Sequence, residues 1–302
     1  MSKSKAWLLN FKYNPIVPLL NSGNESIIYF VERDLLNKKV RPIRYVWNLP
    51  KVQKILKKQQ KDGSWKHYGK ETIEYPAYHY KLVETWKKFR LLVRRYGLTK
   101  EHPKGTKAAE FILSCQTDSG DIRGMIGNQY ATYYTGAMMA LLIKAGYAND
   151  PRIEKGFEWL RSMQHKDGGW TVPMQTHELN RETTNRITSQ YAEPLEPDLN
   201  KPSSRLATDM VLRAFAEHPK YRNSREARRA GNLLKSWFFK KDYYSSYKAA
   251  SYWVRFLFWW PNLMTALRSL SRVNFSRSDP DIRKALEWFI ENQESDGLWK
   301  LT

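Results

Sequence analysis

The sequence predicts an all-α repeat protein, on two observations. A short motif, Gln-x-x-(Asp/Ser)-Gly, occurs four times, and three copies end in Trp two residues after the glycine. Each copy follows apolar residues spaced three and four apart, which is the helical spacing, so each motif is expected to end one helix of a repeated unit. The motif residues are Gln59, Asp62, Gly63 and Trp65; Gln116 and Gly120; Gln164, Asp167, Gly168 and Trp170; and Gln293, Asp296, Gly297 and Trp299.

The residue types of the motif suit a structural role at the end of a helix. Glycine accepts a positive φ at little cost and Asp caps nearby backbone, so the Asp-Gly pair turns the chain. The Gln amide can hydrogen-bond the free backbone groups of a helix end, and the Trp ring can cover the turn. We therefore interpret Asp62, Asp167 and Asp296 as scaffold residues and not as catalytic acids.

A second, more apolar helix is predicted after each motif. Its apolar content indicates that it is enclosed, with the motif-bearing helices outside it. The expected ranges are 75–96, 130–146, 203–217 and 250–273. A degenerate unit fills the gap before the last motif, with Phe238 at the Gln position and Tyr244 at the Trp position. The repeats add up to about five or six helical hairpins.

One domain is expected over residues 1–302, because helical repeats merge into one core. The Pro-rich stretch 171–202 lacks helical periodicity and is predicted to be an inserted loop, a common site for a lid. The aromatic run 252–260 is too short for a membrane span, and we expect a core helix that bends or stops at Pro261. The single Cys115 and the lack of a signal peptide suggest the cytoplasm, with a peripheral membrane position left open.

The chain is strongly basic, with 51 Lys and Arg residues against 30 Asp and Glu residues and a net charge of +21. Basic clusters such as 54–61, 87–95 and 222–229 are expected mainly on outer-helix surfaces. Two interpretations stay open: an anionic partner, such as nucleic acid, an acidic membrane surface or a diphosphate, and an ordinary solvated face.

The repeat, Gln-x-x-Asp-Gly-x-Trp after a Lys-(Gly/Ala)-x-x-aromatic-apolar helix, resembles the QW repeat of squalene and oxidosqualene cyclases. The β subunits of protein prenyltransferases carry related repeats. The resemblance covers about Leu49 to Trp299 and implies an α/α toroid, with inner helices around a central cavity. The N-terminal stretch 14–36 is similar to the opening of small prokaryotic cyclase-like proteins. A helix over 24–36 would follow the last motif and close the ring against Trp288 and Phe289.

The catalytic groups that the resemblance implies are missing from this sequence. The cyclases protonate an alkene with an Asp from an Asp-rich motif, whereas here Asp209 stands alone at the start of a predicted inner helix, one turn after Arg205. Asp209 is the candidate proton donor, and a capping or ion-pair role is the alternative. The prenyltransferases hold zinc with Asp, Cys and His, but here the histidines are scattered and Cys115 ends an outer helix. We therefore predict no metal and no cofactor.

A central cavity is then the expected binding site. If the inner helices run parallel, their N-termini share one mouth, where the helix dipoles favour an anion. Aromatic and basic residues near those starts suit an elongated apolar ligand with a polar head, although the aromatics could equally fill a narrow ring. The predicted binding residues are Tyr78, His79, Tyr130, Tyr133, Tyr134, Arg205, Tyr252, Trp253 and Arg255.

Two functions are compatible with these features. The first is a prenyltransferase- or terpenoid-cyclase-like toroid that binds an isoprenoid-type or other apolar ligand in its cavity, with a lyase, isomerase or transferase activity left open. The alternative is a non-catalytic scaffold whose basic outer face contacts nucleic acid, an anionic membrane or a protein partner. No transmembrane segment is expected in either case.

Overall fold

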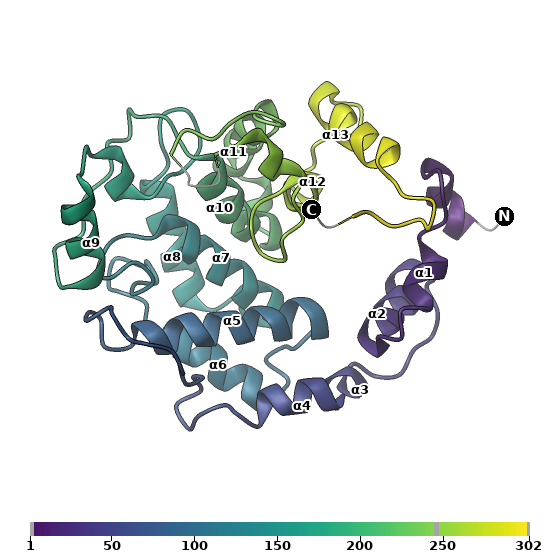
Figure 1. Cartoon of the computed structure of the whole chain (residues 1–302), viewed down its shortest axis with the longest axis horizontal. Coiled ribbons are helices and arrows are strands. Elements are labelled where there is room, and N and C mark those ends of the chain that lie inside the picture. Colours follow the sequence, from purple (N-terminus) through teal and green to yellow (C-terminus); the bar gives the residue numbers. More distant parts are fainter. Residues whose placement is uncertain (1–2, 245–247, 301–302) are drawn as a thin grey trace.

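A computed structural model describes residues 3–244 and 248–300. Its named elements are helices, and Figure 1 shows them following one another around a ring, with one set inside another. The predicted all-α toroid is confirmed. The inner helices are α5 (His79–Tyr96), α7 (Thr132–Leu142), α10 (Arg205–Glu217) and α12 (Leu263–Arg272). The outer helices are α4 (Pro50–Leu56), α6 (Pro103–Leu113), α8 (Pro151–Ser162), α11 (Arg225–Ser236) and α13 (Pro280–Glu291).

Inner and outer helices differ in how they start and what they bury. Most outer helices start at a proline, whose missing N–H costs nothing in the first turn, and Asp150 and Asp279 cap two of them. The inner helix α10 buries 11 of its 13 residues. Gly136 of α7 lets these two inner helices touch, because a Cβ there would lie 2.6 Å from the Cα of Val211. The inner layer is therefore the packed core on which a central site can be built.

At three junctions, α4 to α6, α6 to α8 and α8 to α11, a motif glutamine connects one outer helix to the next. Its Nε2 donates both to the carbonyl of the motif glycine and to the second residue of the following outer helix. The acceptors in the next helix are Lys104 for Gln59, Arg152 for Gln116 and Glu226 for Gln164, at 2.8, 2.8 and 3.1 Å. The same contact at each junction sets successive outer helices in one register around the ring.

The motif glycine packs against the same neighbouring helix. Gly63 has φ +90°, and a Cβ on it would lie 2.1 Å from the carbonyl oxygen of Lys107. Gly120 has φ +106°, and a Cβ on it would lie 2.4 Å from the carbonyl oxygen of Lys155. Only glycine offers both this conformation and this room.

The side chains of the motif Trp and Asp also hold their own repeat together. The Trp indole donates to a carbonyl ten residues earlier, and the Asp accepts from the backbone N–H two residues on. The indole bonds join Trp65 to Ile55, Trp170 to Leu160 and Trp299 to Phe289. The carboxylate bonds join Asp62 to Ser64, Asp167 to Gly169 and Asp296 to Leu298.

The ring closes through the segment that leads into α1 (Ile16–Leu20). Gln293 donates to the carbonyl of Tyr13 at 2.9 Å and accepts from its N–H at 3.0 Å, so α1 takes the place of the next outer helix. Phe11 lies edge-on to Trp299 at 5.9 Å. The predicted closing helix, 24–36, is instead α2 (Glu25–Phe30) with a π-helical turn, η2 (Val31–Leu35). It lies beside α1 and α3 (Arg44–Trp47), apart from α13 (Figure 1).

Residues 250–273 do not form the single helix that we predicted. A 3-10 turn, η6 (Ala250–Val254), is followed by a loop, and α12 begins at Leu263. Pro261 donates no N–H and disfavours a helical conformation at Trp260. Asn262 and Thr265 then start α12 with a reciprocal capping box. The prediction of a core helix over 252–260 is therefore wrong.

The inserted stretch 171–202 is partly helical. It contains η4 (Pro173–Thr176) and α9 (Arg181–Ser189), which the sequence pattern did not indicate. Asn128 and Gln129 anchor its later part, since they donate to the carbonyls of Ala192 and Glu193. No helix in the described part of the chain has the length and hydropathy needed to cross a membrane.

Candidate functional site

A cavity of about 220 Å³ lies between the four inner helices. Its apolar wall is built from Trp86 of α5, Ala137 and Leu141 of α7, and Met210 of α10. The loop between η6 and α12 adds Phe258 and Trp259. The residues on α5 and α10 lie in the middle and C-terminal parts of those helices, so the cavity is away from the N-terminal mouth that we predicted.

Aromatic rings cover one side of this cavity. Trp259 meets Trp86 edge-on at a centroid distance of 4.8 Å and lies nearly parallel to Tyr134 at 6.2 Å. Trp260 stacks on Trp259 at 3.8 Å. Flat, rigid rings of this kind give a large apolar contact area for a ligand at a small cost in conformational entropy.

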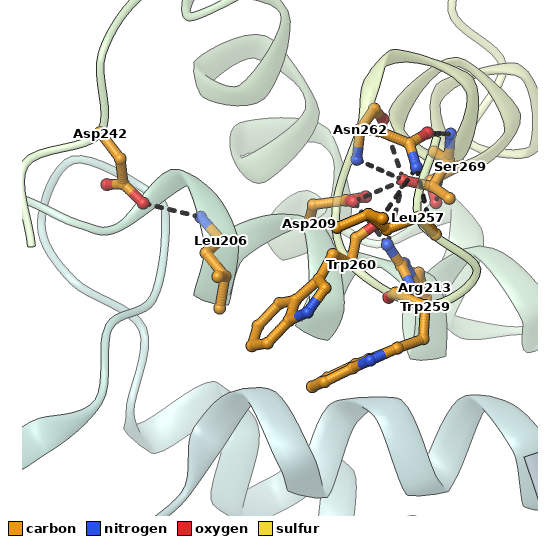
Figure 2. A network of polar contacts seen from close by, with 10 residues as sticks. Leu206, Asp209, Arg213, Asp242, Leu257, Trp259, Trp260, Asn262 and Ser269 are labelled. Carbon is orange, nitrogen blue, oxygen red and sulfur yellow. Dashed lines mark hydrogen bonds and ion pairs between the residues drawn. The ribbon is translucent and has the colours of Figure 1, made fainter. Parts of the chain in front are cut away.

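The loop carrying these rings is tied to α10 by a buried polar network (Figure 2). Arg213 donates to the carbonyl of Trp259 at 3.0 Å and to Asp209 at 2.8 Å. Asp209 also accepts from the hydroxyl of Thr265 at 2.9 Å, and its side chain is fully buried. Asp209 therefore joins α10 to α12 and to the covering loop, which favours the ion-pair role over the proton-donor role.

Five arginines line the cavity, and three of them gather around one acid. Glu217, whose side chain is 7% exposed, pairs with Arg268 at 2.7 Å, with Arg94 at 3.6 Å, and with Arg272. Burial, with the nearby charge of Arg268, lowers the pKa of Arg94. Arg94, Glu217 and Arg272 stand in the last turns of their helices, where the helix dipole favours a cation.

Arg90 differs from the other arginines because it has no acidic partner among the described residues. Its guanidinium lies over Trp86 at 4.5 Å, Trp259 at 5.0 Å and Phe258 at 5.2 Å. Its Nε and Nη1 are buried and make no hydrogen bond in the described structure. Burial lowers the pKa of Arg90. A buried donor without an acceptor is costly, so this side chain is poised for a partner.

The predicted binding residues fall into separate groups. Tyr134 touches the cavity's aromatic cover, and Tyr133 lies against Tyr134 at 4.2 Å. The other residues lie nearer the starts of the inner helices. There Tyr130 donates to Glu196, while His79 Nδ1 is within hydrogen-bond distance of the carbonyl of Gly124, which Tyr78 also borders. The guanidinium of Arg205 lies over the ring of Trp253, and that of Arg255 lies over the ring of Tyr252.

The cavity-lining arginines were not among the predicted binding residues, although Arg90 and Arg94 lie on a stretch that we predicted to be an inner helix. Both stand on the inner helix α5 and face the cavity. A signal was present in the sequence, because Arg90 with Arg94 and Arg268 with Arg272 are spaced four apart on helices predicted to be inner. A charged pair on one face of an enclosed helix indicates a polar interior.

Cys115 is a buried packing residue at the end of α6, 5% exposed. Burial raises the pKa of its thiol to about 12, so little reactive thiolate forms at neutral pH. Among the described residues, no cluster of three or more His, Cys, Asp or Glu side chains is placed to hold a metal ion.

We expect iodoacetamide at pH 8 to leave Cys115 unlabelled in the folded protein and to label it fully in urea, as followed by intact mass. Burial holds the thiol pKa far above the working pH and keeps the reagent away, whereas an exposed thiol forms enough thiolate at pH 8 to react. Rapid labelling without urea would show that this end of α6 opens readily.

Residues 84–193 match a family model described as the squalene-hopene cyclase C-terminal domain, which is less than half of the chain. The predicted terpenoid cyclase-like resemblance is confirmed. The terpenoid cyclase-like region supplies the α5 and α7 walls of the cavity, with Trp86, Arg90 and Arg94. The α10 and α12 walls, with Glu217 and Arg268, lie outside it.

Among solved structures, a protein from Actinoplanes is similar at 16% identity and a TM-score of 0.46, over 85% of this chain and 71% of that one. A type II terpene cyclase from Scytonema is similar at 13% identity and a TM-score of 0.35, over 85% and 82%. A family 10 polysaccharide lyase from Cellvibrio cellulosa is similar at 17% identity and a TM-score of 0.34, over 72% of each chain. None of the curated proteins compared with this chain matches it.

Proposed function

We propose that this terpenoid cyclase-like toroid binds an isoprenoid-type or other apolar ligand in its central cavity. The observation that carries the proposal is the aromatic and aliphatic wall formed by Trp86, Leu141, Met210 and Trp259 between the inner helices. Binding sites for small molecules are typically concave and mostly apolar, with a few polar groups that fix orientation.

An apolar groove adjoins the cavity. Met264 of α12 lines both spaces, and the groove has a volume of about 500 Å³. Its walls include Phe11, Leu267, Phe289 and Trp299, where the ring closes on itself. Ligand sites usually span about 300–1,000 Å³, so an elongated molecule would use the cavity and the groove together.

Catalysis is not part of this proposal. Asp209 has an arginine and a hydroxyl as close partners, and it is not one of the described residues that line the cavity. If turnover of a substrate is found, Asp209→Asn is the first variant to assay, because unchanged turnover would remove the one candidate acid on α10.

A neutral C15 isoprenoid alcohol should quench the fluorescence of Trp86 and Trp259 saturably, with one site per chain. We expect Ala137→Leu to weaken this binding about tenfold, because the added side chain fills part of a small cavity. The matched control is Ala77→Leu on an exposed loop, which should bind like the wild type.

The proposal fails if the alcohol gives no saturable signal, or if both variants bind like the wild type. Displacement of the alcohol by a single-stranded oligonucleotide, with no effect of Ala137→Leu, would favour the basic-scaffold alternative instead.

A further inference from the structure

We propose that the arginine cluster of the cavity recognises a phosphate-type anion, the head of an amphiphilic ligand whose tail lies in the groove beyond Met264. This inference rests on the proposed function, because it assigns a head and a direction to the ligand held in the cavity.

The charge balance of the cavity favours an anion. Five arginines line it, and the acids beside them are Glu217 and Asp209. The adjoining pocket shares Arg94 and is balanced in its other charges, with Arg33 and Lys144 against Asp34 and Glu101. Cations outnumber acids at a site with apolar walls, where the surrounding water screens charge poorly. A phosphate carries roughly −1.5 to −2 charges at neutral pH and matches this excess better than a carboxylate does.

The acids do not occupy every donor. Glu217 holds Arg94, Arg268 and Arg272 in one cluster, and Asp209 holds Arg213. Arg90 keeps its buried Nε and Nη1 without an acceptor among the described residues. Guanidinium groups bind phosphate oxygens through their N–H donors, and Arg90 lines the cavity as the arginine whose charge no acid among the described residues offsets.

Local electrostatics agree with this geometry. Burial lowers the pKa of Arg94, Arg268 and Lys144, and positive neighbours lower it further. Glu217 raises the pKa of all three groups but does not offset the cost of burying their charges. A bound anion would add negative charge and strengthen the cluster.

The groove gives the ligand its direction. Met264 is 51% exposed and borders both the arginine-lined cavity and the apolar groove. The cavity alone is too small for a long chain, whereas the groove offers Leu267, Ile290 and Trp299 as an apolar surface. A ligand whose anionic head lies at Arg90 would therefore place its apolar tail beside Met264, in the groove between the Phe11 and Trp299 segments.

Isothermal titration of the full chain with dodecyl phosphate and with dodecanol, both kept below aggregation, tests the head. We expect the phosphate to bind at least about tenfold more tightly, with an affinity that falls as salt rises. Dodecanoate should bind with an intermediate affinity. Dodecanol binding as tightly as dodecyl phosphate would overturn this inference and leave the proposed function standing, whereas no binding of any probe would overturn both.

Variants locate the head and the tail. Arg90→Gln should weaken dodecyl phosphate about tenfold or more and leave dodecanol unchanged, while Arg222→Gln, which removes an exposed charge, should change neither. Ile290→Ser should weaken dodecyl phosphate and leave butyl phosphate unchanged. Equal effects of Arg90→Gln on dodecyl phosphate and dodecanol, or none on either, would overturn the assigned head site.

Discussion

Trp170→Ala should lower the free energy of unfolding by about 3–5 kcal/mol, the range for deleting a large buried aromatic side chain. Trp170 is fully buried, and its ring lies against Phe215 of α10 at 5.4 Å. Its indole N–H donates to Leu160 at 2.7 Å, and its backbone N–H donates to the hydroxyl of Thr208 at 3.0 Å. The substitution removes the side chain that joins the end of α8 to the inner layer, and urea unfolding measures the loss.

Trp299→Ala is the comparison for this prediction. Trp299 occupies the same motif position and makes the same indole bond, but it is only partly buried. We expect a smaller loss there, because less apolar surface returns to water. Equal losses at the two positions would show that the indole hydrogen bond, and not burial, stabilises the turn.

Glu217→Gln should lower the free energy of unfolding by about 2–3 kcal/mol. Removing one partner of a buried ion pair typically costs about 3–5 kcal/mol, and we reduce that figure because Arg268 and Arg272 are 40% and 39% exposed. Without the carboxylate, three guanidinium groups face one another across the cavity. Sulfate should restore part of the loss, because the anion would take the place of the missing charge.

Glu154→Gln provides the control for the charge change. Glu154 lies on α8, is 44% exposed and pairs with Lys220, which is 68% exposed. The hydroxyl of Tyr221 also donates to Glu154, and glutamine keeps an oxygen that can accept this bond. Exposed pairs contribute about 0–1 kcal/mol, so this variant should remain near the wild type. A Glu217→Gln protein as stable as the control would mean that the arginine cluster needs no organising acid.

The ring was predictable because its determinants are local and repeated. Gln, Gly and Trp at fixed offsets specify one turn, and Gln164 and Gly168 both meet the helix that follows. A sequence shows such offsets directly. The closing contact between Gln293 and the Tyr13 segment was harder to predict from the sequence. The helix that follows Tyr13, α1, is only five residues long and lies at the opposite end of the sequence from Gln293.

The site was harder to predict because it depends on which helix face turns inward. Arg90 and Arg94 belong to a basic cluster on a helix that was predicted to be inner, but the sequence does not show which of its charged residues face the cavity. Pro261 mattered equally: it breaks the expected helix and frees Trp259 to cover the cavity. We predicted the binding site at the N-termini of the inner helices, because helix dipoles favour an anion there. The cavity instead extends toward the C-terminal parts of α5 and α10, where arginines line it.

Photo-crosslinking tests the central claim, that the ligand lies inside the ring, most directly. A neutral isoprenoid alcohol carrying a diazirine is irradiated with the purified protein, and the labelled peptides are mapped by mass spectrometry. We predict labels on Trp86, Met210, Trp259 and Met264, and loss of these labels when the unmodified alcohol competes. Labels confined to the outer helix α11, or labels that competition does not reduce, would contradict the claim.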